Sequence, residues 1–308
     1  MMTRSASTRC LACTLATLLS GAVSSFAQSP SSSMPNLVPR PALEWLTDYG
    51  EGMSLAEERR KMLLVYFYEA ERSVSQQRFE EESLADPDVI DRLRRGYVCV
   101  RVPIGQQVRV DGRLQPLMHF EAFSDLNRRH GAAIIDFVHD DAEYYGHVVS
   151  VLPLENGKYY RFAPHHLSTV LDLPEGTLTQ RTMIFAVRIH PEKPASTTGR
   201  PNQTLFAEAR SHSFDQARRR VQGHHNWAAR FPRISNLLPR GLRAQEVVAE
   251  SWPGESIIDA AVDCVDCWRQ SPGHWNAVRS DQPVFGYDMK RGENGIWYAT
   301  GLFGNADD

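Results

Sequence analysis

The sequence predicts an α+β / α/β protein made of two successive domains. Three apolar runs, MLLVYFY, YVCVRVPI and AAIIDFV, are rich in β-forming residues and are typical of strands buried on both faces. Segments of helical character separate these runs, and this alternation favours a layered α/β domain. A strong amphipathic helix pattern and a closing pair of strands follow. About 280 residues remain without the N-terminal segment, which is enough for two domains.

The first domain is expected over residues 42–175. Helical residues in ALEWLTDYGEGMSLAEERRK precede the first strand, and VSQQRFEEESL and DPDVIDRLRRG follow it as helices. The second of these helices has an Asp N-cap and a Pro at its first position. After the second strand we expect a helix in FEAFSDLNRRHG, and after the third a strand and hairpin in GHVVSVLPL and GKYYRF. APHHLSTVLDLP is expected to close the domain as a helix.

The second domain is expected over residues 180–305, after a short polar linker, LPEGTLTQRT. MIFAVRIH is apolar and fits either a helix or a strand. The segments LFAEARSHSFDQARRRVQG and SIIDAAVDCVDCWRQSPG are predicted helices, and Pro272 and Gly273 end the second one. FGYDM and GIWYATGLFG are predicted strands joined by the turn KRGENG.

The N-terminus has the three-part pattern of a secretory signal peptide. Positive charge near the start is followed by an apolar run from Cys10 to Val23 and by small residues that predict cleavage after Ala27. We therefore expect a signal peptide over residues 1–27, a Ser/Pro-rich linker over residues 28–41, and a secreted or periplasmic protein. The chain has only four lysines among many arginines, a bias typical of a GC-rich bacterial genome.

Charge and hydropathy exclude two classes of partner. The formal net charge is −3, so there is no electrostatic reason to expect a nucleic-acid partner. The apolar run near the N-terminus is shorter than the run of about 20 residues that spans a bilayer, so we expect no integral membrane span. With 42% hydrophobic and 23% charged residues, the composition is ordinary for globular domains.

The motif LLVYF, a following helix, DPDV and a second strand occur in this order within residues 42–175. This order resembles the thioredoxin fold. The segment YEAERSVSQQRF places Ser73 and Gln76 where the family has its two redox cysteines, and Ala132 or Ala133 stands where it has a cis-proline. Because thiol exchange needs an attacking thiolate, the resemblance implies a redox-inactive domain that serves for docking.

Five motifs within residues 180–305 occur in the order of another family. They are LFAEARSHSFDQA, GHHNW, EVVAES, WRQSPGHWNAV and the closing pair FGYDM and GIWYATGLFG. Together they resemble the bacterial form of the CAP superfamily, which includes cysteine-rich secretory proteins, antigen 5 proteins and plant pathogenesis-related proteins. WRQSPGHW with the closing strands is the specific part. The resemblance implies a three-layer α-β-α sandwich.

The resemblance to the CAP superfamily also implies a cleft lined by two histidines and acidic residues. Transferred by motif, the first histidine is His225 or its neighbour His224, the first acid is Glu246 and the second histidine is His274. Two imidazoles and a carboxylate suffice for an open zinc site. His225, His274 and Glu246 are therefore the expected ligands of a Zn²⁺ ion, if the cleft binds one.

The rim of the expected ligand cleft would also carry Trp227 and Trp275, whose rings combine apolar area with a polar group. The second acid of the family, which follows the helix tryptophan, is absent, because Arg269 and Gln270 follow Trp268. Two interpretations stay open: a metal-binding cleft, and a cleft whose histidines are hydrogen-bonded structural residues.

The Cys-x-x-Cys pair of the sequence, Cys264 and Cys267, lies late in a predicted helix. A redox-active pair needs the start of a helix, where the helix dipole lowers the pKa of the attacking thiol. We therefore expect both cysteines to face the core together with Trp268. A zinc site made of these cysteines and two histidines is the alternative. Cys99 lies inside the second strand and is expected to be a small buried residue.

These observations favour a secreted bacterial binding protein without catalytic residues. Its CAP-like domain would bind a small ligand or a cell-envelope protein, and its thioredoxin-like domain would serve as a docking module. A metal-dependent hydrolase that uses His225, Glu246 and His274 is the first alternative. An oxidoreductase that uses Cys264 and Cys267 is the second.

Overall fold

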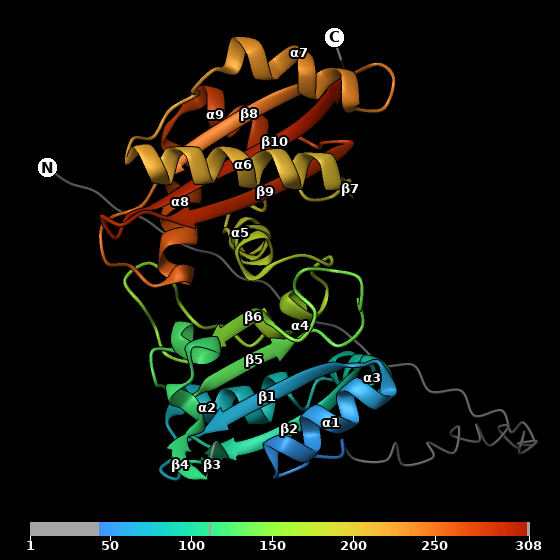
Figure 1. Ribbon diagram of the computed structural model, residues 1–308, viewed down its shortest axis with the longest axis vertical. Helices are drawn as coiled ribbons and strands as arrows, with labels where there is room; N and C mark the ends of the chain where they lie inside the picture. The colour runs from blue at the N-terminus through green and yellow to red at the C-terminus, as the bar shows by residue number, and fades with distance from the viewer. Residues whose placement is uncertain (1–42, 111, 307–308) are drawn as a thin grey trace, which may run out of the picture. The chain divides into compact units, whose positions relative to one another are not determined.

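The computed structural model describes residues 43–110 and 112–306. The expected signal peptide, residues 1–27, and linker, residues 28–41, lie outside the described residues. From Leu43 onwards the chain forms one compact unit of mixed α/β structure. The described residues form two four-stranded sheets and a two-stranded hairpin, with helices packed on both larger sheets (Figure 1).

The first sheet has the strand order β2-β1-β5-β6. At its centre, β1 (Met62–Tyr68) runs parallel to β2 (Tyr97–Pro103) and antiparallel to β5 (Gly131–Ile135), which pairs antiparallel with β6 (Val148–Pro153). The side chains of residues 63–67 are fully buried, because other elements cover both faces of β1. The strands predicted from the apolar runs are therefore confirmed.

Short helices and a hairpin accompany the first sheet. They are α1 (Tyr49–Arg59), α2 (Val74–Arg78), the π-helical turn η1 (Phe79–Ser83), α3 (Pro87–Gly96), the hairpin of β3 (Gln107–Val110) and β4 (Arg113–Pro116), the 3₁₀ helices η2 (Leu117–His119) and η3 (Glu121–Leu126), and α4 (His166–Leu171). Side chains fix where several helices begin: Asp48 caps α1, Ser73 caps α2 and Asp86 caps α3, each accepting a backbone N–H. The predicted Asp-Pro start of α3 is confirmed.

Two expectations for the first sheet and its surroundings are wrong, and one hairpin is missing from the prediction. Residues 120–131 form only the short helix η3, and GKYYRF at residues 157–162 forms no strand. In that segment the backbone N–H of Tyr160 donates to a carboxylate oxygen of Asp259 at 2.8 Å instead of to a neighbouring strand. The β3–β4 hairpin is not predicted either, because each of its strands has only four residues and most of their side chains are exposed.

The second sheet has the strand order β7-β9-β10-β8. Its members are β7 (Arg200–Pro201), β8 (Leu242–Glu250), β9 (Val284–Arg291) and β10 (Trp297–Ala306). β10 pairs antiparallel with both β8 and β9, so the two predicted closing strands are confirmed. Gly301 of β10 gives room to a neighbouring ring, since a Cβ at this position would lie 2.6 Å from the ring of Tyr287.

Helices cover both faces of the second sheet. They are α5 (Leu178–Ile189), α6 (Gln203–Arg219), α7 (Trp227–Leu237), α8 (Ile257–Gln270) and α9 (Pro272–Arg279). On β10, Thr300 bonds to Ser213 of α6, whereas the next residue, Gly301, lies beside Tyr287, which packs against Trp268 of α8. Because neighbouring residues of a strand point to opposite faces, α6 and α8 lie on opposite sides of the sheet (Figure 1).

The helix α5 begins inside the expected linker. Thr177 and Gln180 form a capping box, in which each side chain accepts the backbone N–H of the other residue. This box starts the helix at Leu178, and MIFAVRIH, which fitted either a helix or a strand, is helical. The linker is therefore shorter than the sequence predicts.

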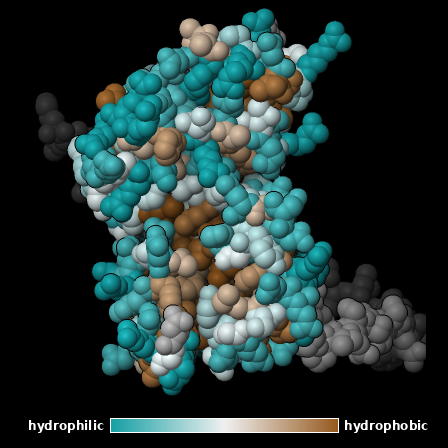
Figure 2. All heavy atoms as spheres, viewed as in Figure 1, coloured by the Kyte–Doolittle hydropathy of each residue, from teal (hydrophilic) through white to brown (hydrophobic). Residues whose placement is uncertain are grey.

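The surface of the molecule is mainly polar. Figure 2 shows that hydrophilic residues cover most of the face in view and that hydrophobic residues gather in patches between them. Large apolar side chains with more than half of their area exposed include Val74, Leu114, Phe214 and Trp252. No helix in the described part of the chain is long and apolar enough to cross a membrane.

The buried guanidinium of Arg181, in the first turns of α5, joins three elements. The residue is 3% exposed and donates, at 2.6 to 3.2 Å, to the hydroxyl of Ser150 and to the carbonyl oxygens of Val149, Val170, Leu173 and Pro174. Burial lowers the pKa of this guanidinium, so its charge depends on these acceptors for compensation. The start of α5, the strand β6 and the end of α4 are thus held by one side chain.

We expect Arg181→Met to lower the free energy of unfolding by at least about 3 kcal/mol, because it removes hydrogen bonds to five acceptors, most of them buried. Denaturant unfolding followed by tryptophan fluorescence measures this change. Arg218→Met is the matched control, since the side chain of Arg218 is 67% exposed and pairs with Asp215 at the surface. The control should change the free energy by less than about 1 kcal/mol. Equal effects of the two substitutions would contradict the role of Arg181.

His166 in α4 is a histidine held in its neutral form. The residue is 4% exposed, and its Nδ1 atom accepts the backbone N–H of Ala163 at 3.2 Å. Burial, followed by the charge of His165, lowers the pKa of His166 from 6.5 to about 4. The folded chain therefore excludes a proton that the unfolded chain binds in this pH range.

This histidine should make the wild-type protein less stable as the pH falls from 6.5 to about 4, because the unfolded state gains protons first. A shift of this size corresponds to about 3 kcal/mol. We expect the free energy of unfolding of the wild type, relative to that of His166→Asn, to fall by this amount between the two pH values. Urea denaturation of both proteins across this range measures it, and a constant difference would speak against the assignment.

Candidate functional site

Three side chains from different elements meet beside the second sheet. His224 lies in the loop between α6 and α7, Glu246 on β8, and His274 in the first turn of α9. The Nδ1 atom of His224 donates to Oε1 of Glu246 at 3.0 Å, and its Nε2 atom lies 3.2 Å from Nε2 of His274. The fold thus brings together three of the residues that the sequence predicts for the ligand cleft.

Glu246 is the buried member of this group. Its side chain is 1% exposed; Nη2 of Arg230 lies 2.6 Å from Oε2, and Nε2 of His212 lies 3.7 Å from Oε1. Burial favours the neutral carboxyl, but the hydrogen bonds from His224 and Arg230 and the nearby charges outweigh it, so the pKa of Glu246 is lowered. Glu246 is therefore an anion near neutral pH, and both of its oxygens are engaged.

The two histidines that face each other differ in exposure. Burial and the neighbouring His224 lower the pKa of His274, although Glu246 opposes this effect. His274 is thus neutral near neutral pH, the form in which an imidazole nitrogen can bind a metal. The side chain of His224 is 42% exposed, so the pair is open to solvent.

His225 lies apart from this group. Its Nε2 atom donates to the backbone carbonyl of Val221 at 3.0 Å, and its ring centroid lies 6.0 Å from that of His212. The sequence did not decide between His224 and His225 as the first histidine of the cleft. His224 is the one that contacts Glu246 and His274. The expected metal ligand His225 does not contact Glu246 or His274, because its ring is turned toward His212 of α6.

The two tryptophans expected at the rim have different surroundings. Trp227 is half-buried; it packs on Phe231, and the guanidinium of Arg230 lies 5.5 Å from its ring centroid. Trp275 is 6% exposed and packs on His190, with 4.9 Å between the ring centroids. Consecutive helical residues point about 100° apart, so Trp275 lies in the core and does not share an open rim with His274.

The three described cysteines are free thiols. Cys99 and Cys264 are buried, as predicted; burial raises the pKa of Cys99 to about 12 and that of Cys264 well above its usual range. Cys267 is only half-buried, contrary to the expected core-facing position, and burial with nearby acidic side chains raises its pKa to about 11. Trp268, beside it on α8, is fully buried as predicted.

The residues expected at the places of the thioredoxin family's cysteines have structural partners. Ser73 caps α2, as described above. The amide of Gln76, which is fully buried, accepts the backbone N–H of Glu69 at 3.0 Å and donates to its carbonyl oxygen at 3.2 Å. Ala132 and Ala133 lie within β5 and pair with β1. None of these side chains supplies a thiolate for exchange.

Arg230 and His212 belong to the site but do not stand out in the sequence. Arg230 reaches Glu246 from α7 and His212 from α6, the two helices that flank the His224 loop. The only signal in the sequence is that His212 lies on the apolar face of an amphipathic helix, where a polar side chain needs a partner. That partner is the carbonyl oxygen of Gly223, which accepts from Nε2 of His212 at 3.0 Å.

Comparisons with known proteins give weak likenesses. No protein-family model matches the chain, and no curated protein matches it. Among solved structures, an outer surface protein from Borrelia burgdorferi is 20% identical over 35% of this chain and 78% of that chain, with a TM-score of 0.29. A thioredoxin from Thermus thermophilus is 22% identical over 25% of this chain and 73% of that chain, with a TM-score of 0.20. Likenesses at these TM-scores support no conclusion about fold or function.

We expect the thiols of the native protein to react slowly with a chromogenic disulfide reagent near neutral pH. At a pKa of about 11, only about one Cys267 side chain in 10,000 is a thiolate. Cys267→Ser should remove most of the slow reaction of the native protein, whereas Cys99→Ser should leave it unchanged. Reaction of native Cys267 as fast as that of the unfolded chain would argue for a redox role.

Proposed function

We propose that the protein is an exported bacterial binding protein with two domains. Its thioredoxin-like domain serves for docking, and its CAP-like domain holds a zinc ion between His224 and His274. The ion and its surroundings form part of the surface that binds a small ligand or a cell-envelope protein. In this proposal the signal peptide, residues 1–27, directs the protein out of the cytoplasm.

The architecture supports the two domain assignments. In the first sheet, a central strand β1 followed by the helix α2 pairs with a parallel strand on one side and an antiparallel strand on the other. In the second sheet, helices cover both faces. These arrangements agree with the thioredoxin-like order and the three-layer sandwich that the motifs predict.

The distance between the two imidazole nitrogens carries the metal proposal. A tetrahedral zinc ion with zinc–nitrogen bonds of 2.0–2.1 Å places two of its nitrogen ligands about 3.3 Å apart. The Nε2 atoms of His224 and His274 lie 3.2 Å apart. One ion bound to both nitrogens therefore fits with little movement of either ring.

Glu246 orients the first ligand. A metal-binding imidazole almost always donates its second N–H to a carboxylate or carbonyl group, which fixes the ring and its tautomer. His224 does so through Nδ1, whose proton goes to Oε1 of Glu246. The lone pair on Nε2 of His224 is then directed at His274, ready for the ion.

Binding is better supported than hydrolysis. A zinc hydrolase needs a carboxylate that can take a proton from metal-bound water. Both oxygens of Glu246 are engaged, by His224 and Arg230, and its lowered pKa makes it a weak base. Two protein ligands leave the other positions of the ion open, and a ligand from a partner can occupy them.

Zinc titration of the purified mature protein tests this proposal. We expect His224→Ala/His274→Ala to bind one equivalent of zinc fewer per chain than the wild type, measured by calorimetry and by metal analysis. His225→Ala is the matched control, since His225 is the neighbouring histidine but bonds only to a carbonyl group, and it should retain this equivalent. Equal zinc binding by the double variant and the wild type would refute the metal in this cleft and leave the His224–His274 contact a hydrogen bond.

A further inference from the structure

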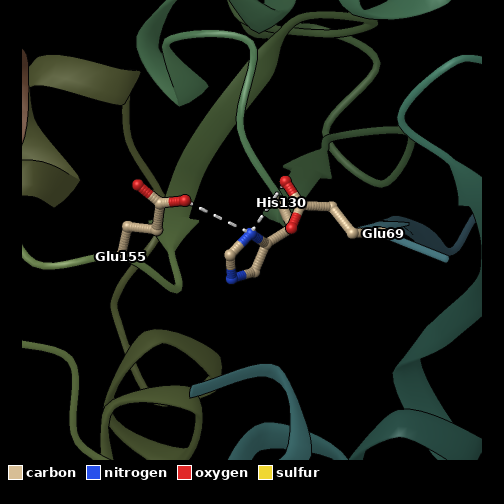
Figure 3. Close-up of side chains that lie close together, drawn as sticks. All are labelled: Glu69, His130 and Glu155. Atoms are coloured by element: carbon tan, nitrogen blue, oxygen red, sulfur yellow. Dashed lines mark ion pairs between the residues drawn. The ribbon is translucent and has the colours of Figure 1, made fainter. Parts of the chain in front are cut away.

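We propose a second divalent-metal site, formed by Glu69, His130 and Glu155 at one edge of the first sheet. Neither the motifs nor the proposed function assigns a role to this group. One ligand atom from each of the three residues lies within 4.8 Å of the other two. Figure 3 shows the imidazole of His130 between the two carboxylates.

His130 is buried, and one of its ring nitrogens lacks a hydrogen-bond partner. The residue is 1% exposed, and its Nδ1 atom lies 3.5 Å from Oε1 of Glu69 and 3.6 Å from Oε1 of Glu155 (Figure 3). A charged imidazole that bonds to a carboxylate is normally 2.7–2.9 Å from it. The nitrogen instead lies almost equally far from both oxygens, so a direct hydrogen bond does not account for its position.

The same distances suit three ligands around one ion. Metal–ligand bonds of 2.0–2.2 Å place neighbouring ligand atoms about 3.0 to 3.5 Å apart, depending on the coordination geometry. The distances from Nδ1 of His130, 3.5 and 3.6 Å, lie at and just above the upper limit of this range. A contraction of a few tenths of an ångström, within reach of two glutamate side chains, would complete the site.

The other nitrogen of His130 can carry the ring proton when Nδ1 binds an ion. Nε2 lies 3.0 Å from Oγ of Ser73 and 3.3 Å from Oγ of Ser75, and either hydroxyl can accept its proton. With the proton on Nε2, the lone pair on Nδ1 faces two carboxylates. A lone pair aimed at two anions in a buried place is unfavourable without a cation between them, and a metal-bound histidine has this arrangement of partners.

The nearby arginine does not occupy the atoms that would bind the metal. Arg129 pairs with Oε2 of Glu155, while Oε1 of the same carboxylate faces His130. The arginine thus holds Glu155 in place without occupying its metal-facing oxygen. A doubly charged cation would balance the charge of the two carboxylates.

Sheet topology brings the three ligands together. Glu69 directly follows the last residue of β1, His130 directly precedes the first residue of β5, and Glu155 comes two residues after the end of β6. Because β5 runs antiparallel to β1 and to β6, the end of β1, the start of β5 and the end of β6 lie at the same edge of the sheet. The site is therefore built on paired strand ends, with Gln76 holding the backbone of Glu69.

One imidazole and two carboxylates indicate a transition-metal ion. Ca²⁺ and Mg²⁺ prefer sites made of oxygen ligands alone, whereas Zn²⁺ accepts nitrogen and oxygen together. Among the divalent ions that take this mixed set, zinc binds more tightly than manganese or iron. We therefore assign the site to zinc, with three protein ligands and an open position for water or for a ligand.

The test uses the mature protein with His224→Ala/His274→Ala, which removes the other proposed metal site, so that the two proposals succeed or fail separately. We expect this protein to bind one zinc equivalent, measured by calorimetry and by competition with a chromogenic chelator. Adding Glu69→Gln/Glu155→Gln should weaken the binding at least about tenfold, the loss that follows even from removing an outer partner of a ligand. Adding Glu71→Gln/Glu82→Gln, two exposed glutamates nearby, should leave it unchanged.

Nitrogen chemical shifts of His130 provide a readout that does not depend on the variants. Zinc should shift the Nδ1 resonance and leave Nε2 protonated, and far-UV circular dichroism checks that the variants are folded. Absence of zinc binding in the starting protein, unchanged binding after Glu69→Gln/Glu155→Gln, or a His130 ring protonated on both nitrogens with or without zinc would overturn the proposal.

Discussion

The buried guanidinium of Arg181 is the interaction on which the rest of the structure depends. It bonds to four carbonyl oxygens and a hydroxyl from β6, from the end of α4 and from the turn that follows α4. The helix α5 that carries it also packs on β6, β9 and α8, so its position affects both sheets. A charged group is tolerated in this core because its donors are paired with five oxygen acceptors.

The neighbours of buried polar atoms also distinguish the two candidate sites. Oε1 of Glu246 accepts the hydrogen bond from His224 and Oε2 lies 2.6 Å from the guanidinium of Arg230, so this carboxylate orients His224 and, with its lowered pKa, is a weak base. Nδ1 of His130 has no hydrogen-bond partner, although the residue is almost completely buried. In the two proposed sites, Glu246 is thus a supporting group and His130 is a ligand.

The sequence predicts those parts of the fold whose signal is local. Continuous apolar runs identified β1 and β2, and the Asp86–Pro87 pair identified the start of α3. Motifs pointed to Glu246 and His274, but the choice between His224 and its neighbour depends on the path of a loop, which no pattern encodes. His130 was missed because its partners are 61 and 25 residues away along the chain, and they meet only through strand pairing.

Strand pairing also explains why Glu69, His130 and Glu155 lie together at one edge of the first sheet. An antiparallel neighbour always places its start beside the end of the strand it pairs with, so polar residues after β1, before β5 and after β6 must converge. Ser73 and Gln76 cap and clamp the segment that follows β1 without any thiol. These hydrogen bonds therefore hold the strand end that carries Glu69, one of the residues of the proposed metal site.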